Sequence, residues 1–171
     1  MEVRYSFNGS EVREGLKIFQ RDTIYKKNAI YSVILLAIFM IYTVNIIRNP
    51  SEAFSIFLAA LCLAVLMFLW YLPAKHVKKT AEAADKEEMW FTMTVYDNCV
   101  RIKEEKGGFV IEYGKEISKV FETINLFLIC VGKERIFILP KRFLTDGREE
   151  QVRELFQSGM GEQFITVKVK E

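Results

Sequence analysis

Two stretches without a single charged side chain stand out in the hydrophobic pattern of the chain. They are NAIYSVILLAIFMIYTVNII at residues 28–47 and AFSIFLAALCLAVLMFLWYL at residues 53–72. A helix rises about 1.5 Å per residue, so each stretch is long enough to cross roughly 30 Å of hydrocarbon. The alternative is a pair of buried core helices, but soluble helices of this length usually carry a polar face, and neither stretch has one. We therefore predict a transmembrane hairpin over residues 28–73.

Positive charges flank this hairpin at its outer ends, whereas the connecting segment RNPSE has only Arg48. The positive-inside rule then predicts a multi-pass protein with both termini in the cytoplasm. Asn49-Pro50-Ser51 predicts the tight turn between the spans. Six juxtamembrane residues are also candidates for contact with anionic lipid, although an ordinary positive-inside flank explains them without a specific lipid. They are Lys26, Lys27, Lys75, His76, Lys78 and Lys79.

The polar segments on either side of the hairpin predict three further elements. EVRYSF at residues 2–7 alternates apolar and polar side chains, the period of a strand with one buried face, and we predict that it joins the cytosolic sheet. Ser10 is placed to cap the amphipathic helix that fills the rest of residues 1–27. This helix lies on the membrane surface, docks on its own domain or runs into the first span. Pro73 marks the exit of the second span, and residues 74–88 have the composition of an exposed helical stalk.

From residue 89 onward the pattern changes to short alternating runs that are separated by turn residues. Strands at this close spacing predict an antiparallel sheet that curls into a small barrel or sandwich. Turns are predicted at Asp97-Asn98, at Lys106-Gly107-Gly108 and at Gly132-Lys133. The six strands are predicted at residues 89–96, 99–105, 109–113, 119–123, 126–131 and 135–140.

A helix is expected after the sixth strand. Asp146 and Glu149 have part of a capping-box pattern, and Gly159 is placed to end the helix. Its apolar face consists of Val152, Leu155 and Phe156.

The alternation in QFITVKVK at residues 163–170 predicts a last strand, which we expect beside the N-terminal one. The predicted fold class is therefore an α+β membrane protein. It combines the two-helix transmembrane hairpin with a cytosolic antiparallel β-barrel or sandwich at residues 89–171, closed by a C-terminal helix.

The layout of two spans followed by a β-rich domain resembles the YcxB-like family of small bacterial membrane proteins. Residues 111–156, IEYGKEISKVFETINLFLICVGKERIFILPKRFLTDGREEQVRELF, look like the C-terminal domain of that family almost throughout. The specific pieces are Tyr113 ahead of Ile117 and Val120, Glu122-Thr123 ahead of a hydrophobic strand, and Leu139-Pro140-Lys141-Arg142 followed by Phe143.

The chain is also similar to bacterial membrane proteins with pleckstrin-homology-like domains, in which a C-terminal helix closes a curved sheet. The resemblance implies a bacterial inner-membrane location, but it implies no substrate and no cofactor. The strand predicted at residues 163–170 departs from the family pattern.

Residues with catalytic or metal-binding chemistry are few. His76 is the only histidine, and no cysteine, serine or carboxylate stands at a spacing that would build a triad around it. The cysteines have no CxxC spacing, so we predict free thiols at Cys62, Cys99 and Cys130. The segment KGGF at residues 106–109 lacks the pattern of a phosphate-binding loop and is better explained as a hairpin turn. We therefore predict no catalytic residues, no metal site and no cofactor.

Lys141-Arg142 lies at a corner between a strand and a helix. The N-terminus of a helix favours an anion, so a phosphate or an acidic lipid headgroup is one candidate ligand. The alternative is a solvated structural corner that Glu149-Glu150 neutralises. The residues of the candidate anion site are Lys133, Arg135, Lys141, Arg142 and Arg148.

The charge balance excludes nucleic acid as a partner, because residues 74–171 contain 17 basic and 17 acidic side chains. We expect an integral membrane protein that is not an enzyme and whose cytosolic domain binds a protein partner or the membrane surface. Its expected partners are membrane lipids, together with another protein or further copies of the chain. The alternatives are an accessory subunit of an export or envelope-stress system and a homo-oligomeric structural membrane protein.

Overall fold

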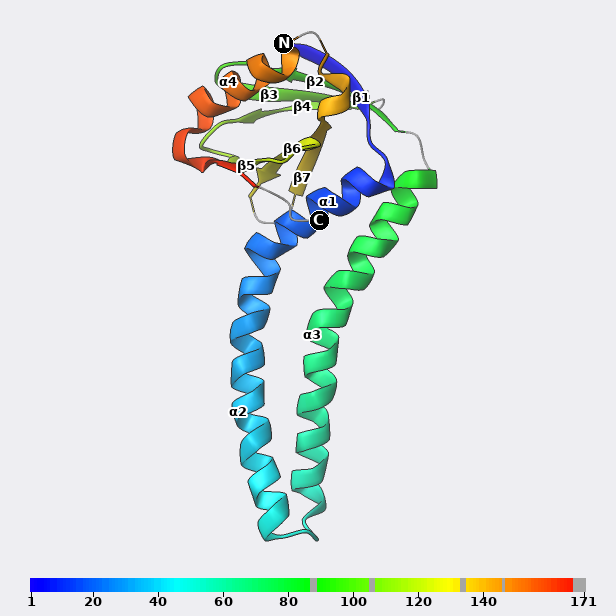
Figure 1. Ribbon diagram of the computed structural model, residues 1–171, viewed down its shortest axis with the longest axis vertical. Coiled ribbons are helices and arrows are strands. Elements are labelled where there is room, and N and C mark those ends of the chain that lie inside the picture. The colour runs from blue at the N-terminus through cyan, green and yellow to red at the C-terminus, as the bar shows by residue number, and fades with distance from the viewer. Residues whose placement is uncertain (87–88, 105–106, 133–134, 146, 168–171) are drawn as a thin grey trace. The chain divides into compact units, whose positions relative to one another are not determined.

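The structure is a computed structural model that describes residues 1–86, 89–104, 107–132, 135–145 and 147–167 (Figure 1). The chain is α+β and divides into two compact units, residues 1–17 with 80–171 and residues 18–79. Parts of several predicted features lie outside the described residues, including residues 87–88 of the stalk, residue 105 of the second strand and Lys133 of the third turn. The others are Lys106 of the second turn, Lys133 as a member of the basic corner, Asp146 of the capping box and Lys168-Val169-Lys170 of the last strand.

The unit of residues 18–79 contains one apolar helix and the larger part of a second. A π-helical turn, η1 (Arg21–Tyr25), leads into α2 (Lys26–Arg48), and α3 (Ala53–Lys86) follows. Between them, the Asn49 N–H donates to the Asn45 carbonyl at 2.8 Å and the Glu52 N–H donates to the Asn49 carbonyl at 3.1 Å. These bonds confirm the predicted turn. The helices lie side by side (Figure 1), and Trp70 Nε1 donates to Ser32 Oγ across them at 3.1 Å.

Both helices are long and apolar enough to cross a membrane. In the helical stretch Gly9–Arg48, none of the 18 residues of its most apolar segment is buried. In α3, 17% of the corresponding segment is buried. Large side chains such as Ile47 and Met67 are each 74% exposed. A core helix of a soluble protein would bury most of such a segment, so the helices are compatible with a membrane protein. Helical structure is also continuous from Gly9, and the predicted N-terminal helix therefore runs into the first apolar helix.

Pro73 lies inside α3, which continues to Lys86. The predicted stalk is therefore a continuation of the second apolar helix, and Pro73 ends no helix. Proline has no N–H, so the carbonyl of Leu69 has no helical donor at this position. The side chain of Asn28 in α2 replaces that donor, because its Nδ2 lies 2.6 Å from the Leu69 oxygen.

The first sheet contains β1 (Glu2–Ser6), β2 (Trp90–Val95), β3 (Cys99–Glu104) and β4 (Gly107–Glu112), in the order β1-β2-β3-β4. Its neighbours are antiparallel. Val3 stands opposite Met93, which confirms that the N-terminal strand joins the sheet. The two apolar helices are thus an insertion between β1 and β2. Gly107 and Gly108 pair with β3, so the prediction that both belong to the turn was wrong.

The second sheet contains β5 (Ile117–Glu122), β6 (Leu126–Val131), β7 (Arg135–Pro140) and β8 (Phe164–Thr166), in the order β7-β6-β5-β8. Strand β8 runs parallel to β5, so the last strand does not lie beside the N-terminal one as predicted. Of the two predicted alternatives, barrel or sandwich, the structure excludes the closed barrel. A barrel needs a continuous ladder, whereas an isolated bridge from Tyr113 to Ile117 is the pairing seen between β4 and β5 among the described residues.

One hydrophobic core lies between the two sheets and under α4 (Arg148–Met160). The first sheet contributes Met93 and Ile102, the second contributes Phe127 and Ile129, and α4 contributes Phe156. Each of these side chains is fully buried. Val152 is buried as well and Leu155 is partly buried, so the predicted apolar face of this helix is confirmed.

The N-terminus of α1 (Gly9–Gln20) corrects the prediction that Ser10 is the cap. Asn8 Oδ1 accepts the N–H of Glu11 at 2.9 Å, and Glu11 Oε2 accepts the N–H of Asn8 at 2.9 Å. This reciprocal pair is a capping box with Asn8 as the cap. Ser10 lies within the first turn instead.

The C-terminus of α4 is also displaced from the prediction. Gly161 rather than Gly159 follows the last helical residue, and its φ of 52° lies in the left-handed region that favours glycine. Gly159 is required for packing instead, because a Cβ there would lie 2.5 Å from Cδ2 of Tyr113.

Candidate functional site

The cationic end of Lys141 points into the domain. Lys141 begins the short 3₁₀ helix η2 (Lys141–Phe143), which follows β7 directly. Its Nζ lies 2.7 Å from Oε1 of Glu122 and 2.9 Å from Oε1 of Glu149, and its side chain is only 10% exposed. Nζ also lies 4.9 Å from the centroid of the Phe127 ring, within the range of a cation–π contact. Lys141 is therefore held by protein groups.

Glu122 is the centre of this ion-pair cluster. Its carboxylate is buried and also accepts a hydrogen bond from Arg153 Nε at 2.8 Å. Burial alone would raise the pKa of Glu122, but the hydrogen bonds from Arg153 and Lys141 outweigh it and hold the pKa below its ordinary value. Arg153 also pairs with Glu149 and Glu150. The cluster thus joins β5, η2 and α4 at one corner of the domain.

Arg142 pairs with a different carboxylate. Its Nε donates to Glu11 Oε1 at 2.7 Å, and its Nη2 donates to Glu11 Oε2 at 3.2 Å and to the carbonyl of Ser6 at 3.2 Å. Glu11 is the residue that completes the capping box of α1. Arg142 therefore fastens the start of α1 and the end of β1 to the corner after β7.

The other residues of the candidate anion site do not gather around Lys141. Arg135 begins β7 and is exposed, so roughly 20 Å of extended strand separates it from Lys141. Arg148 is exposed at the start of α4, and Lys133 lies outside the described residues. The carboxylate partners of Lys141 and Arg142 favour a structural corner over an anion site. The anion site stays a prediction.

The juxtamembrane cations lie on the two long helices. Lys26 and Lys27 begin α2, and Lys26 Nζ pairs with Asp22 Oδ1 at 2.8 Å. Lys75, His76, Lys78 and Lys79 lie on α3 beyond Pro73, and Lys75 Nζ lies 5.6 Å from the centroid of the Tyr71 ring. Their contact with lipid stays a prediction. Cys62, Cys99 and Cys130 form no disulfide bond, as predicted.

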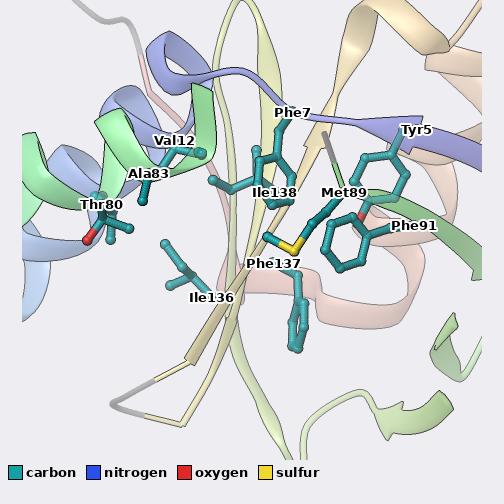
Figure 2. A pocket seen from close by; sticks show the side chains of 12 residues that line it. Tyr5, Phe7, Val12, Thr80, Ala83, Met89, Phe91, Ile136, Phe137 and Ile138 are labelled. Carbon is teal, nitrogen blue, oxygen red and sulfur yellow. The ribbon is translucent and has the colours of Figure 1, made fainter. Parts of the chain in front are cut away.

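An apolar pocket of about 350 Å³ lies in the unit of residues 1–17 and 80–171 (Figure 2). It lies among β1, β2, β7, the start of α1 and the last turns of α3. None of the lining side chains carries a charge, and the polar side chains among them are those of Tyr5 and Thr80. The lining residues are Tyr5, Phe7, Val12, Leu16, Thr80, Ala83, Ala84, Met89, Phe91, Ile136, Phe137 and Ile138.

This pocket was not predicted, although one signal in the sequence pointed toward it. Strand β6 is hydrophobic at every position, and its first five residues are all buried. Such a run is typical of a strand covered on both faces. Here the core covers one face and α1 covers the other, since a Cβ on Gly15 would lie 3.0 Å from Ile138 and 3.2 Å from Leu128. The pocket lies beside this contact.

The architecture defines a class of protein: a two-sheet α+β domain with a pair of long apolar helices inserted between its first two strands. Residues 95–156, from the end of β2 into α4, match the family model described as YcxB-like protein. This match confirms the resemblance to the YcxB-like family over that part of the chain. No curated protein and no solved structure gives a significant match.

Proposed function

We propose that this chain is a non-catalytic binding protein of the bacterial cell membrane. Its two apolar helices anchor a pleckstrin-homology-like domain, and this domain binds the hydrocarbon chain of a membrane lipid in the apolar pocket. The pocket carries the proposal, because a cavity without charged lining recognises hydrocarbon rather than a headgroup. The bacterial location and the pleckstrin-homology-like assignment follow from the family resemblance.

The exposure of the apolar helices supports the membrane anchor. Side chains such as Val33, Ile47 and Met67 are 68%, 74% and 74% exposed. Apolar surface costs about 25 cal/mol per Å² when it faces water, so these helices need a lipid or protein environment. The pleckstrin-homology-like assignment is supported by the two sheets around one core and by α4, which packs against that core.

The size and chemistry of the pocket suit one segment of an acyl chain. Its volume lies near the lower end of the range for small-molecule sites, about 300–1,000 Å³. Each buried methylene contributes about 0.8 kcal/mol, so six methylenes contribute roughly 5 kcal/mol before the entropic cost of binding. The side chains around the space come from β1, β2, β7, α1 and α3, together with Phe7 and Met89 (Figure 2). A flexible Met suits an irregular apolar ligand.

The surroundings of Glu122 support a non-catalytic role. A general acid or base needs a pKa near the operating pH, whereas two cationic side chains hold the pKa of Glu122 low. Glu122 is also occupied by these hydrogen bonds rather than directed at the pocket, since it is not among the lining residues.

Photocrosslinking of the full-length chain tests the proposal. The protein is placed in nanodiscs with a phospholipid that carries a diazirine at the end of one acyl chain, and mass spectrometry locates the adducts. We expect adducts at Met89, Ile136 or Phe137 in addition to those on the apolar helices. The pocket-filling change Ala84→Phe should reduce the pocket adducts several-fold, whereas Ala74→Phe, on an exposed part of the same helix, should not.

Adducts confined to residues 28–72 would overturn the proposal. Thermal unfolding of each variant checks that its fold is intact. If Ala84→Phe unfolds, Thr80→Leu narrows the same pocket from the preceding turn of the helix and replaces it in the test.

A further inference from the structure

Strand β4 is an edge strand of the first sheet. Its hydrogen-bonding pattern shows which backbone N–H and C=O groups face outward. The N–H of Tyr113 donates to the carbonyl of Asn98 at 3.1 Å. Bonded and non-bonded pairs alternate in an antiparallel ladder, so the register makes Ile111 and Phe109 the next residues bonded to β3. The N–H and C=O groups of Gly108, Val110 and Glu112 therefore point to the free edge.

The groups of Glu112 confirm this direction and are already used. Its N–H donates to Glu116 Oε2 at 3.2 Å, and its carbonyl accepts the N–H of Glu116 at 3.2 Å. Among the described residues, Gly108 and Val110 are left with exposed backbone groups and no recorded bond on this edge. Two residues thus offer two donors and two acceptors to a further strand.

This edge lacks the features that usually prevent strand addition. Residues 107–111 contain no charge, no proline and no bulge, while Phe109 and Val110 are 37% and 46% exposed. On the opposite edge of the same sheet, Arg142 donates to the carbonyl of Ser6 and so occupies one outward group of β1. Strand β4 is therefore the edge of this sheet that is open to pairing.

We propose that two copies of the chain pair through β4 in antiparallel register about a twofold axis. Gly108 of each copy then stands opposite Val110 of the other. The four free N–H groups of the two copies donate to the four free carbonyls across the interface. Side chains on opposite residues must share a face of the sheet, and this register meets that condition. The two Phe109 side chains meet at the axis, next to the Phe137 ring whose centroid is 5.3 Å from that of Phe109.

The shape of the outer face supports a second copy as the occupant. Gly108 has no side chain and lies in a hollow lined by Arg101, Lys103 and Val110 among others. In the proposed register the exposed Val110 of one copy covers Gly108 of the other. The same short strand thus supplies both the projection and the hollow, and it matches itself in both backbone and side chains.

Disulfide trapping in the full-length chain tests the pairing. In a background with Cys62, Cys99 and Cys130 changed to Ser, Phe109→Cys places the two thiols in a non-bonded pair, where the Cα atoms are about 4.5 Å apart. We expect oxidation in nanodiscs to convert most of this variant to a covalent dimer. Val110→Cys should trap several-fold less, because the two copies of residue 110 are offset by two positions.

Two controls keep the result interpretable. Ser158→Cys, on the exposed side of α4, measures random collision. Val110→Pro removes the outward N–H of residue 110 and leaves the hydrogen bonds between β4 and β3 in place. It should therefore abolish disulfide trapping in the Phe109→Cys chain. If this variant does not fold, Val110→Lys tests the same edge. Trapping at residue 109 no greater than at residue 158, or trapping that survives both edge variants, would overturn the proposal.

The dimer edge and the acyl-chain pocket use different residues, because the lining of the pocket includes no residue of β4, and they meet at the contact between Phe109 and the lining residue Phe137. A trapped dimer whose photocrosslinks avoid the pocket would leave the β4 pairing intact and remove the lipid proposal. Capture of a different protein by the wild-type edge without any trapping of the Cys variant would overturn the self-pairing.

Discussion

We predict that the hydrogen bond from Asn28 to Leu69 stabilises the helix pair because Pro73 interrupts the bonding of α3. The carbonyl of Leu69 would accept the N–H of residue 73 in an unbroken helix, and proline removes that donor. Asn28 Nδ2 donates to this oxygen at 2.6 Å instead, and Asn28 is 7% exposed. Replacing Asn28 with Leu keeps the number and branching of the side-chain heavy atoms but leaves the Leu69 oxygen without a partner.

The cost of Asn28→Leu follows from the burial of the bond. An unsatisfied buried polar group costs about 1–3 kcal/mol in soluble proteins, and side-chain hydrogen bonds between membrane helices average about 0.6 kcal/mol with a maximum near 1.7. We therefore expect a loss of roughly 1–1.5 kcal/mol in the free energy of unfolding. In a Pro73→Ala chain the new N–H bonds to Leu69, so the same Asn28→Leu change should cost less than about 0.5 kcal/mol.

A double-mutant cycle on the full-length chain measures this coupling. Unfolding in mixed micelles is followed by SDS titration with far-UV circular dichroism. Gln20→Met is the matched control, because Gln20 Nε2 donates to the carbonyl of residue 73 at 3.3 Å and that carbonyl is present in both backgrounds. Equal costs of Asn28→Leu in the wild-type and the Pro73→Ala backgrounds would refute the reasoning.

Three further predictions concern the β domain and are measured by thermal or urea unfolding of the full-length chain. Glu122→Gln should lower the free energy of unfolding by roughly 2–3 kcal/mol. This is less than the loss for a fully broken buried ion pair, because Lys141 and Arg153 keep other carboxylate partners. Because the pKa of Glu122 is lowered on folding, its contribution to stability is complete above about pH 4.5 and is lost as the pH falls through the pKa in the folded protein. The stability of the Glu122→Gln chain should therefore depend less on pH in the acid range. Arg142→Glu should lower the stability of the domain, because it places two carboxylates at the Arg142–Glu11 contact. Adding Glu11→Arg should restore part of the lost stability, because it re-forms an ion pair with the charges exchanged. Gly159→Ala should cost about 1–3 kcal/mol because Tyr113 must move.

Each of these predictions has an outcome that contradicts it. An acid transition identical in the wild-type and Glu122→Gln chains would remove the role given to that carboxylate. Absence of any recovery in the charge-swapped pair would argue against a structural corner at Arg142. A neutral Gly159→Ala, compared with Ser158→Ala on the exposed face, would show that the Tyr113 ring moves at little cost.

Much of the local structure was predictable because it depends on short-range periodicity. The uncharged stretches at residues 28–47 and 53–72 lie within α2 and α3. The predicted runs at residues 126–131 and 135–140 coincide with β6 and β7. These patterns are local because a side chain's neighbours on one face of a helix or strand are set by the period of that element.

The helix ends were less predictable because several residues compete for each cap. Asn8 and Ser10 are both good caps, and the reciprocal bond with Glu11 favours Asn8. Gly159 and Gly161 both suit a C-terminus, and packing decided between them, since Gly159 lies against Tyr113 while Gly161 adopts a positive φ.

The sequence by itself determined where the chain is apolar enough for membrane-length helices, where it alternates as strands, and that its middle and C-terminal part resembles the YcxB-like family. Only the tertiary structure decided that the strands form two sheets rather than a barrel and that Glu122 and Glu11 bind the cations of the basic corner. Glu11 and Arg142 are 131 positions apart, and Glu122 and Lys141 are 19 apart. Such pairings depend on how the whole core packs, so no local pattern could assign those carboxylates or the apolar pocket.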